Sequence, residues 1–128
     1  MKIRGVLSIM ILIMALIVWP AGSSADQKIV VGGKNFTEQY LLAELARFLL
    51  EENGFQVQLE TGVGSVVVRR SLLNGQIDLY YEYTGTAYTV YYKQSSPEIM
   101  TDSHRVYQWV KDADAKKGLV WLQPLSLN

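Results

Sequence analysis

Residues 28–45 read KIVVGGKNFTEQYLLAEL, and the change of pattern within this stretch decides the fold. The run 28–31 is typical of a short buried strand, which Gly32 and Gly33 end. Asn35 is placed to cap a helix with Glu38 reaching back to it, so a helix is predicted over 36–53. Its large apolar residues recur at helical spacing: Leu41, Leu45, Phe48 and Leu49. A strand that leads directly into a helix indicates a β-α-β unit and therefore a parallel sheet.

The alternation of strand and helix continues along the rest of the chain. After the first helix, the patterns predict a strand at 55–60, a helix at 66–75, a strand at 77–83, helices at 84–93 and 102–117, and a strand at 119–122. A polar break, KQSSP, separates the last two helices. The order βαβαβααβ predicts the α/β class, with an open, mainly parallel sheet and flanking helices.

Ligands of such sheets bind where the carboxyl ends of the strands meet, and two predicted loops lie there. The first is GGKNFTEQ, in which Lys34 stands just before the start of a helix. The backbone N–H groups and the dipole of a helix start favour an anion, so Lys34 would suit a carboxylate ligand. The alternative is that Lys34 is a solvated loop residue and that Asn35 is only a cap.

The second loop, EYTGT, lies within a concentration of aromatic residues, since six of the eight tyrosines fall within 80–92. Tyr83 ends the predicted strand at the crevice, Gly85 allows close approach of a ligand, and Thr86 offers a hydroxyl and an N–H. A ring attracts a cation through its π face, and a quaternary ammonium cannot donate N–H hydrogen bonds. Tyr83 is therefore a candidate ring for a cationic ligand. A packing role on a helix is expected for the remaining helical tyrosines, Tyr88, Tyr91 and Tyr92.

The N-terminal segment 1–25 has the features of a signal peptide, with a basic start, an uncharged run over 5–18 and small residues before Asp26. The remaining segment, 26–128, carries two more acidic than basic side chains, which argues against a nucleic-acid-binding face. The chain has no cysteine for a disulfide or a lipid anchor. We therefore expect a freely soluble exported protein, with the Gram-negative periplasm favoured.

Catalytic signatures are weak in this sequence. The single histidine, His104, lies in a polar stretch, and neither a thiol nor a GxSxG motif is present. Asp78 and Glu82 lie too far apart along a strand to act on one bond. Metal-ligand spacings are also missing, so we expect no catalysis, no metal and no cofactor.

The motifs resemble a known family. The blocks GGKNFTEQYLLAELARFLLEENG, TGVGSVVVRRSLLNGQIDLYYEYTGT and WLQPLSLN are similar to those of periplasmic substrate-binding proteins of ABC transporters for glycine betaine, choline and carnitine. The resemblance extends from Lys28 to the last residue. It implies a two-lobed protein of the type II class, in which two α/β lobes close over a quaternary amine in an aromatic cage and then dock on a membrane permease.

Within this resemblance, four residues occupy positions of the family's ligand site: Lys34, Gln39, Tyr83 and Thr86. Lys34 and Thr86 match contacts to the polar end of the ligand, Tyr83 matches a ring of the cage, and Gln39 is a weaker match. Two positions depart from the usual motifs, since Gly33 replaces a serine and Tyr81 replaces a proline.

The chain is much shorter than members of this family, so the resemblance implies only the N-terminal portion of the first lobe. We therefore expect a truncated solute-binding component with weak or no binding on its own, and an exposed apolar surface where returning segments pack in the family. The alternative is a stand-alone exported interaction or sensor module that presents its tyrosine face to a protein partner.

Overall fold

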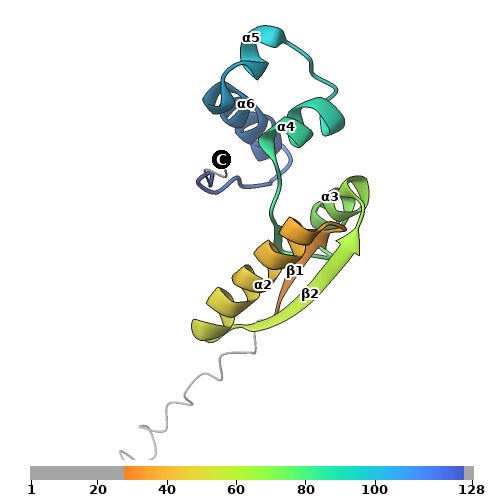
Figure 1. Ribbon diagram of the computed structural model, residues 1–128, viewed down its shortest axis with the longest axis vertical. Coiled ribbons are helices and arrows are strands. Elements are labelled where there is room, and N and C mark those ends of the chain that lie inside the picture. Colours follow the sequence, from red (N-terminus) through yellow and green to blue (C-terminus); the bar gives the residue numbers. More distant parts are fainter. Residues whose placement is uncertain (1–27, 126–128) are drawn as a thin grey trace, which may run out of the picture.

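The computed structural model describes residues 28–125, and it places a small parallel sheet beside a group of helices (Figure 1). The strands are β1 (Lys28–Lys34), β2 (Gln56–Val63) and β3 (Leu79–Tyr80), in the order β2-β1-β3, and both pairings are parallel. The predicted α/β class with a parallel sheet is confirmed.

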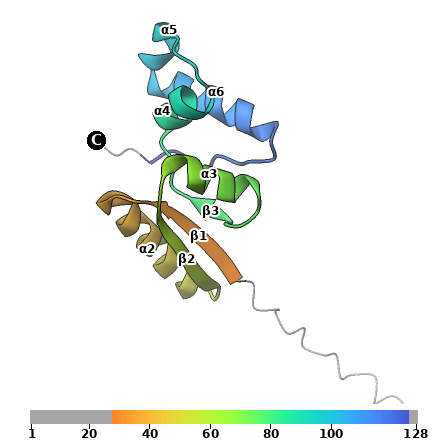
Figure 2. The ribbon, with the colours of Figure 1, turned by 90° about the vertical axis from the view of Figure 1, so that its right-hand side faces the viewer.

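Two crossover helices cover the two faces of the sheet (Figure 2). On one face, α2 (Thr37–Glu52) packs through Ala43 and Ala46 against Val31 of β1. On the other face lies α3 (Ser65–Leu73), whose Val68 is so close to Gly32 that a Cβ atom at this glycine would lie 3.1 Å from Val68 Cγ2. The alternation of strand side chains therefore places successive β1 residues against different helices.

The large apolar residues whose spacing predicted α2 lie on its outer face. Leu41 is 67% exposed, and three more side chains are about half exposed: Leu45, Phe48 and Leu49. Small alanines face the sheet instead, which lets the helix axis approach the strands closely. The outer face of α2 is therefore an exposed apolar surface.

The tyrosine-rich segment after β3 is helical, as predicted. It begins with a short turn, α4 (Thr84–Thr86), and continues as the π-helix η1 (Ala87–Tyr91). Tyr88 is buried and meets the ring of Trp109 edge-on at 4.9 Å, on the helix α6 (Ser103–Ala115). Tyr91 packs against the same core and Tyr92 also meets Trp109 edge-on, so the packing role predicted for these tyrosines is confirmed.

Two sequence-based predictions of local structure are wrong, and one helix was not predicted. The helix α2 begins after Phe36, without a side-chain cap, so Asn35 is not its cap. Residues 119–122 form no strand, because no strand lies beside them, and the segment instead runs under α6 with Tyr107 donating to the Leu122 carbonyl (Figure 2). An unpredicted short helix, α5 (Pro97–Met100), begins at the end of the polar break.

A buried ion pair joins α6 to α3, the helix that covers one face of the sheet. Arg69 of α3 binds both carboxylate oxygens of Asp114 of α6, with one N–O distance of 2.9 Å. Asp114 also accepts hydrogen bonds from Tyr92 and from Trp121, whose Nε1 lies 2.6 Å away. Four donors therefore satisfy one fully buried carboxylate. We call Asp114, Arg69, Tyr92 and Trp121 the Asp114 cluster.

The two charges of this ion pair stabilise each other against burial. Burial disfavours the charged form of Arg69, but the hydrogen bonds and charge of Asp114 outweigh it, so the pKa of Arg69 lies above its usual value. Burial likewise acts to raise the pKa of Asp114, but its donors bring that pKa below the usual value.

Within residues 28–125, no helix is both long enough and apolar enough to cross a membrane. The predicted signal peptide at 1–25 lies outside the described residues.

Candidate functional site

The carboxyl ends of β1 and β3 bring three of the four predicted site residues together. The Nζ atom of Lys34 lies 4.8 Å from the centroid of the Tyr83 ring, and Gln39 Nε2 donates to the Tyr83 hydroxyl at 3.3 Å. Thr86 lies three residues further along, half-buried in the single turn of α4. The predicted meeting of the two loops is therefore present, whereas the ligand contacts of these residues stay predictions.

Lys34 lies at the end of a strand and is paired with a carboxylate. It belongs to β1 and is only 1% exposed, so it is not a solvated loop residue. Its ammonium is also not free for a carboxylate ligand in this conformation, because it is paired with the carboxylate of Glu82. Sequence reasoning considered Glu82 only as a catalytic group and missed this ion pair.

Glu82 accepts hydrogen bonds from four donors, which makes it the centre of a second cluster. Besides Lys34, its donors are the Tyr83 backbone N–H at 2.7 Å, the Tyr80 hydroxyl at 2.8 Å and the Tyr91 hydroxyl at 2.6 Å. Burial raises the pKa of both Tyr80 and Tyr91, and the neighbouring carboxylate adds to the shift. The two hydroxyls therefore stay protonated and act as donors. We call these five residues the Glu82 cluster.

The rim of the site faces solvent and is aromatic and acidic. The ring of Phe36 stacks near-parallel to that of Tyr83, with centroids 6.2 Å apart, and it is 40% exposed. The Tyr83 hydroxyl donates to exposed Glu38 at 2.8 Å. The pKa of Tyr83 is raised, first by burial and also by Glu38, against an opposing effect of Gln39.

Phe36 and Glu38 were not predicted as rim residues, although both belong to the quoted motif GGKNFTEQ. The residue type gave no signal for Phe36, because an apolar residue beside a helix start commonly packs back on the helix.

The structure also explains one departure from the family's usual motif. A Cβ atom at Gly33 would lie 2.8 Å from Thr61 Cγ2 of the neighbouring strand, which is closer than ordinary contact. A serine at this position would require Thr61 to shift. At Gly85, by contrast, a Cβ would meet no atom within 4 Å, so the rim beside Thr86 is open.

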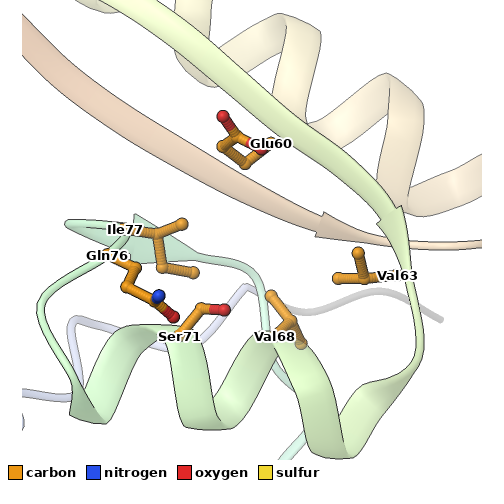
Figure 3. Close-up of a pocket in the computed structure, with 6 residues that line it drawn as sticks. All are labelled: Glu60, Val63, Val68, Ser71, Gln76 and Ile77. Atoms are coloured by element: carbon orange, nitrogen blue, oxygen red, sulfur yellow. The ribbon is translucent and has the colours of Figure 1, made fainter.

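A separate hollow of about 280 Å³ lies between β2 and α3 (Figure 3). Its lining residues include none of the predicted site residues: Glu60, Val63, Val68, Ser71, Gln76 and Ile77. In the described part of the chain, no group of three or more His, Cys, Asp or Glu side chains is placed to hold a metal ion.

Comparison with known proteins identifies the family to which these features belong. Residues 27–128 match the family model described as the substrate-binding domain of ABC-type glycine betaine transport systems. The chain belongs to this family. The match extends through both loops of the site.

Individual relatives agree with this assignment. A glycine-betaine-binding protein of Pseudomonas aeruginosa is 36% identical over 84% of this chain. The glycine betaine-binding protein YehZ of Escherichia coli is 30% identical over 81% of it, and an apo structure of YehZ superposes with a TM-score of 0.70 at 29% identity over 76% of the chain. EgtU of Helicobacter pylori, named an ergothioneine transport permease and ergothioneine binding protein, is 35% identical over 60% of the chain.

The chain spans only part of each relative. It covers 34% of the two glycine-betaine-binding proteins, 35% of the YehZ structure and 15% of EgtU. The structure therefore shows a portion of the family's fold. Neither the family nor these relatives supports the alternative of a stand-alone interaction or sensor module.

Proposed function

We propose that this chain supplies part of the solute-binding surface of an ABC importer for quaternary-ammonium osmoprotectants. The ligand class comprises glycine betaine, choline and carnitine. The family supports this class, as do two relatives named for glycine betaine and one named for ergothioneine. Glycine betaine and ergothioneine share a trimethylammonium group, which is the chemical feature that the site must recognise.

One observation carries the proposal: two aromatic rings, Phe36 and Tyr83, lie near-parallel at a solvent-exposed rim, with the carboxylate of Glu38 bonded to the Tyr83 hydroxyl. Ring faces and a nearby carboxylate both attract a cation that cannot donate N–H hydrogen bonds. Gln39 and Thr86 would bind the polar end of the ligand. The ammonium of Lys34 lies over the Tyr83 ring, and its proposed contact to an anionic end requires it to turn from Glu82.

Binding by this chain alone should be weak. A rim open to water keeps each ring near the lower limit of the cation–π range, at about 0.5–1 kcal/mol per ring. Closure by a second lobe would desolvate the cation and strengthen each contact. We expect millimolar dissociation constants for glycine betaine.

NMR titration of the protein lacking residues 1–25 with glycine betaine tests this function, with sodium chloride as the control for ionic strength. Saturable shifts of the amides of Phe36, Tyr83 and Thr86 are expected, and Tyr83→Ala should abolish them. The control variant Tyr40→Ala removes an exposed tyrosine of α2 that is not a predicted site residue, and it should leave these amide shifts unchanged. The absence of saturable shifts would refute the binding site, and micromolar affinity in isothermal titration would refute weak binding.

In this proposal the protein acts in the periplasm without catalysis and delivers its solute to an ABC permease in the inner membrane. The predicted signal peptide supports export, and the absence of cysteine agrees with a soluble product. Expression in a Gram-negative host should yield a periplasmic protein that begins at Asp26. Mass spectrometry of the periplasmic and membrane fractions checks this, and an unprocessed chain in the membrane fraction would contradict it.

A further inference from the structure

Two of the four asparagines in this chain are followed by glycine, at Asn53-Gly54 and at Asn74-Gly75. An Asn-Gly step is prone to spontaneous deamidation, because glycine has no side chain to hinder the attack of its backbone nitrogen on the asparagine amide. Both asparagines are exposed to solvent, and neither belongs to the candidate site. Their surroundings in the folded protein therefore decide which of them reacts first.

The two steps have nearly the same backbone geometry. Asn53 ends α2 with φ −97° and ψ 12°, and Asn74 ends α3 with φ −91° and ψ 1°. Each following glycine has a positive φ and donates its N–H to a carbonyl of the same helix, at 2.9 Å for Gly54 and 3.0 Å for Gly75. Both helices thus end in a Schellman motif. Because a nitrogen whose N–H is bonded to a carbonyl is a poor nucleophile, the last turn must open before either asparagine reacts.

The side chains of the two asparagines differ. Asn53 Nδ2 donates to the Leu49 carbonyl at 2.7 Å, which anchors this amide on α2. Within residues 28–125, the side chain of Asn74 forms no hydrogen bond of this kind. Ring closure at Asn53 therefore requires one more hydrogen bond to break than ring closure at Asn74.

The residues that close the two helix ends also differ. A Schellman motif is commonly completed by an apolar contact between the third residue before the cap and the second residue after it. In α2 these positions hold Leu50 and Phe55, and Leu50 packs on the β1 core. In α3 they hold Ser71 and Gln76, which both line the hollow between β2 and α3 (Figure 3). The end of α3 is therefore held less firmly than the end of α2 and should open more often.

We propose that Asn74 is the first site of spontaneous deamidation in the folded protein. When the last turn of α3 opens, the Gly75 nitrogen loses its proton to solvent and attacks the side-chain carbonyl carbon of Asn74. The new N–C bond closes a five-membered succinimide ring, and the Cγ–Nδ2 bond breaks to release ammonia. Water, the only co-reactant, then opens the ring at one of its two carbonyls and gives aspartate or, mainly, isoaspartate.

Isoaspartate at this position should alter the entry into β3. It adds a methylene group to the backbone and so displaces the N–H groups of Gly75 and Gln76, which close α3. Shortly afterwards, Asp78 makes the first contacts with β1. Its N–H donates to the Val30 carbonyl at 2.8 Å, and its carboxylate accepts from the Val30 N–H at 2.7 Å. Deamidation therefore loosens the link between α3 and β3.

Incubation of the purified protein near neutral pH tests this proposal, with the deamidated peptides quantified by mass spectrometry after digestion. Deamidation at Asn74 should be faster than at Asn53 by about fivefold or more, which is the factor that one typical hydrogen bond supplies. In concentrated urea, where both helix ends are unfolded, the two rates should converge. Equal rates in the folded protein, or a faster rate at Asn53, would overturn the proposal.

Two matched variants exchange the residue that follows the glycine. Phe55→Gln gives α2 the residue of α3 and should speed deamidation at Asn53 by about threefold or more, without a change at Asn74. Gln76→Phe makes the reverse exchange at α3 and should slow deamidation at Asn74 alone. A ratio of the two rates that stays the same in both variants would overturn the proposed cause. The comparison within the wild type needs no substitution, so it remains decisive should either variant fail to fold.

Discussion

The Glu82 cluster and the Asp114 cluster use the same arrangement in two places that differ in their exposure. In each, a buried carboxylate accepts hydrogen bonds from four donors, which include one paired cation and at least one tyrosine hydroxyl. The Asp114 cluster closes the contact between α3 and α6, inside the protein. The Glu82 cluster lies directly behind a rim that opens to water through Phe36, Glu38 and Tyr83.

This difference indicates how the same interaction serves stability in one place and ligand binding in the other. A buried ion pair is costly to break from one side, because the remaining charge is left without a partner. Around Asp114, the free energy needed to break the pair stabilises the contact between α3 and α6. Around Glu82 the same cost would oppose the turn of Lys34 from Glu82 toward the anionic end of a ligand.

The largest expected effect is on the Asp114 side of the comparison. Asp114→Asn leaves Arg69 buried without a counter-charge and should destabilise the protein by about 3–5 kcal/mol. Urea unfolding followed by tryptophan fluorescence measures this loss. Asp112→Asn is the matched control on the same helix, where the carboxylate is exposed and should contribute little. A loss below about 1 kcal/mol for Asp114→Asn would mean that the junction does not depend on this pair.

A smaller effect should appear at alkaline pH. Burial, together with the hydrogen bond to Asp114, raises the pKa of Tyr92 to about 12 from its ordinary value of 10.0. The folded state therefore holds a proton that the unfolded state loses first, so the stability that this tyrosine contributes should be complete below about pH 10 and should fall as the pH rises toward about 12. Tyr92→Phe should show a shallower fall over this window in denaturant titrations. An identical slope in both proteins would contradict the role of Tyr92.

The smallest effect is expected outside both clusters, on the outer face of α2. Leu45 is about half exposed, so Leu45→Ala should change the stability by no more than about 0.5 kcal/mol. Leu50, on the sheet-facing side, packs against the β1 core, and Leu50→Ala should cost about 2 kcal/mol. Equal losses measured by urea unfolding would show that the outer face is covered in solution.

Local patterns predicted most of the elements but not the extent of the sheet. The strand predicted at 77–83 is paired only over Leu79–Tyr80, and the strand predicted at 119–122 is absent. Period-two alternation reports which side of the chain is apolar, whereas a strand forms only where a neighbouring strand supplies hydrogen bonds. Side chains still alternate in this segment, since Tyr81 packs toward α2 and Tyr80 lies on the opposite side with Glu82.

By itself, the sequence determined the order of the elements as far as β3 and the meeting of its two motif loops, because periodicity and parallel topology both follow from local pattern. Only the tertiary structure decided that Lys34 is buried against Glu82 and that α2 packs closely through its alanines, with Leu41, Leu45 and Leu49 outward. These outcomes depend on contacts between residues far apart in the chain, or on the close approach of a helix to a sheet. Such distances and fits are set by three-dimensional packing, which no local period of the sequence contains.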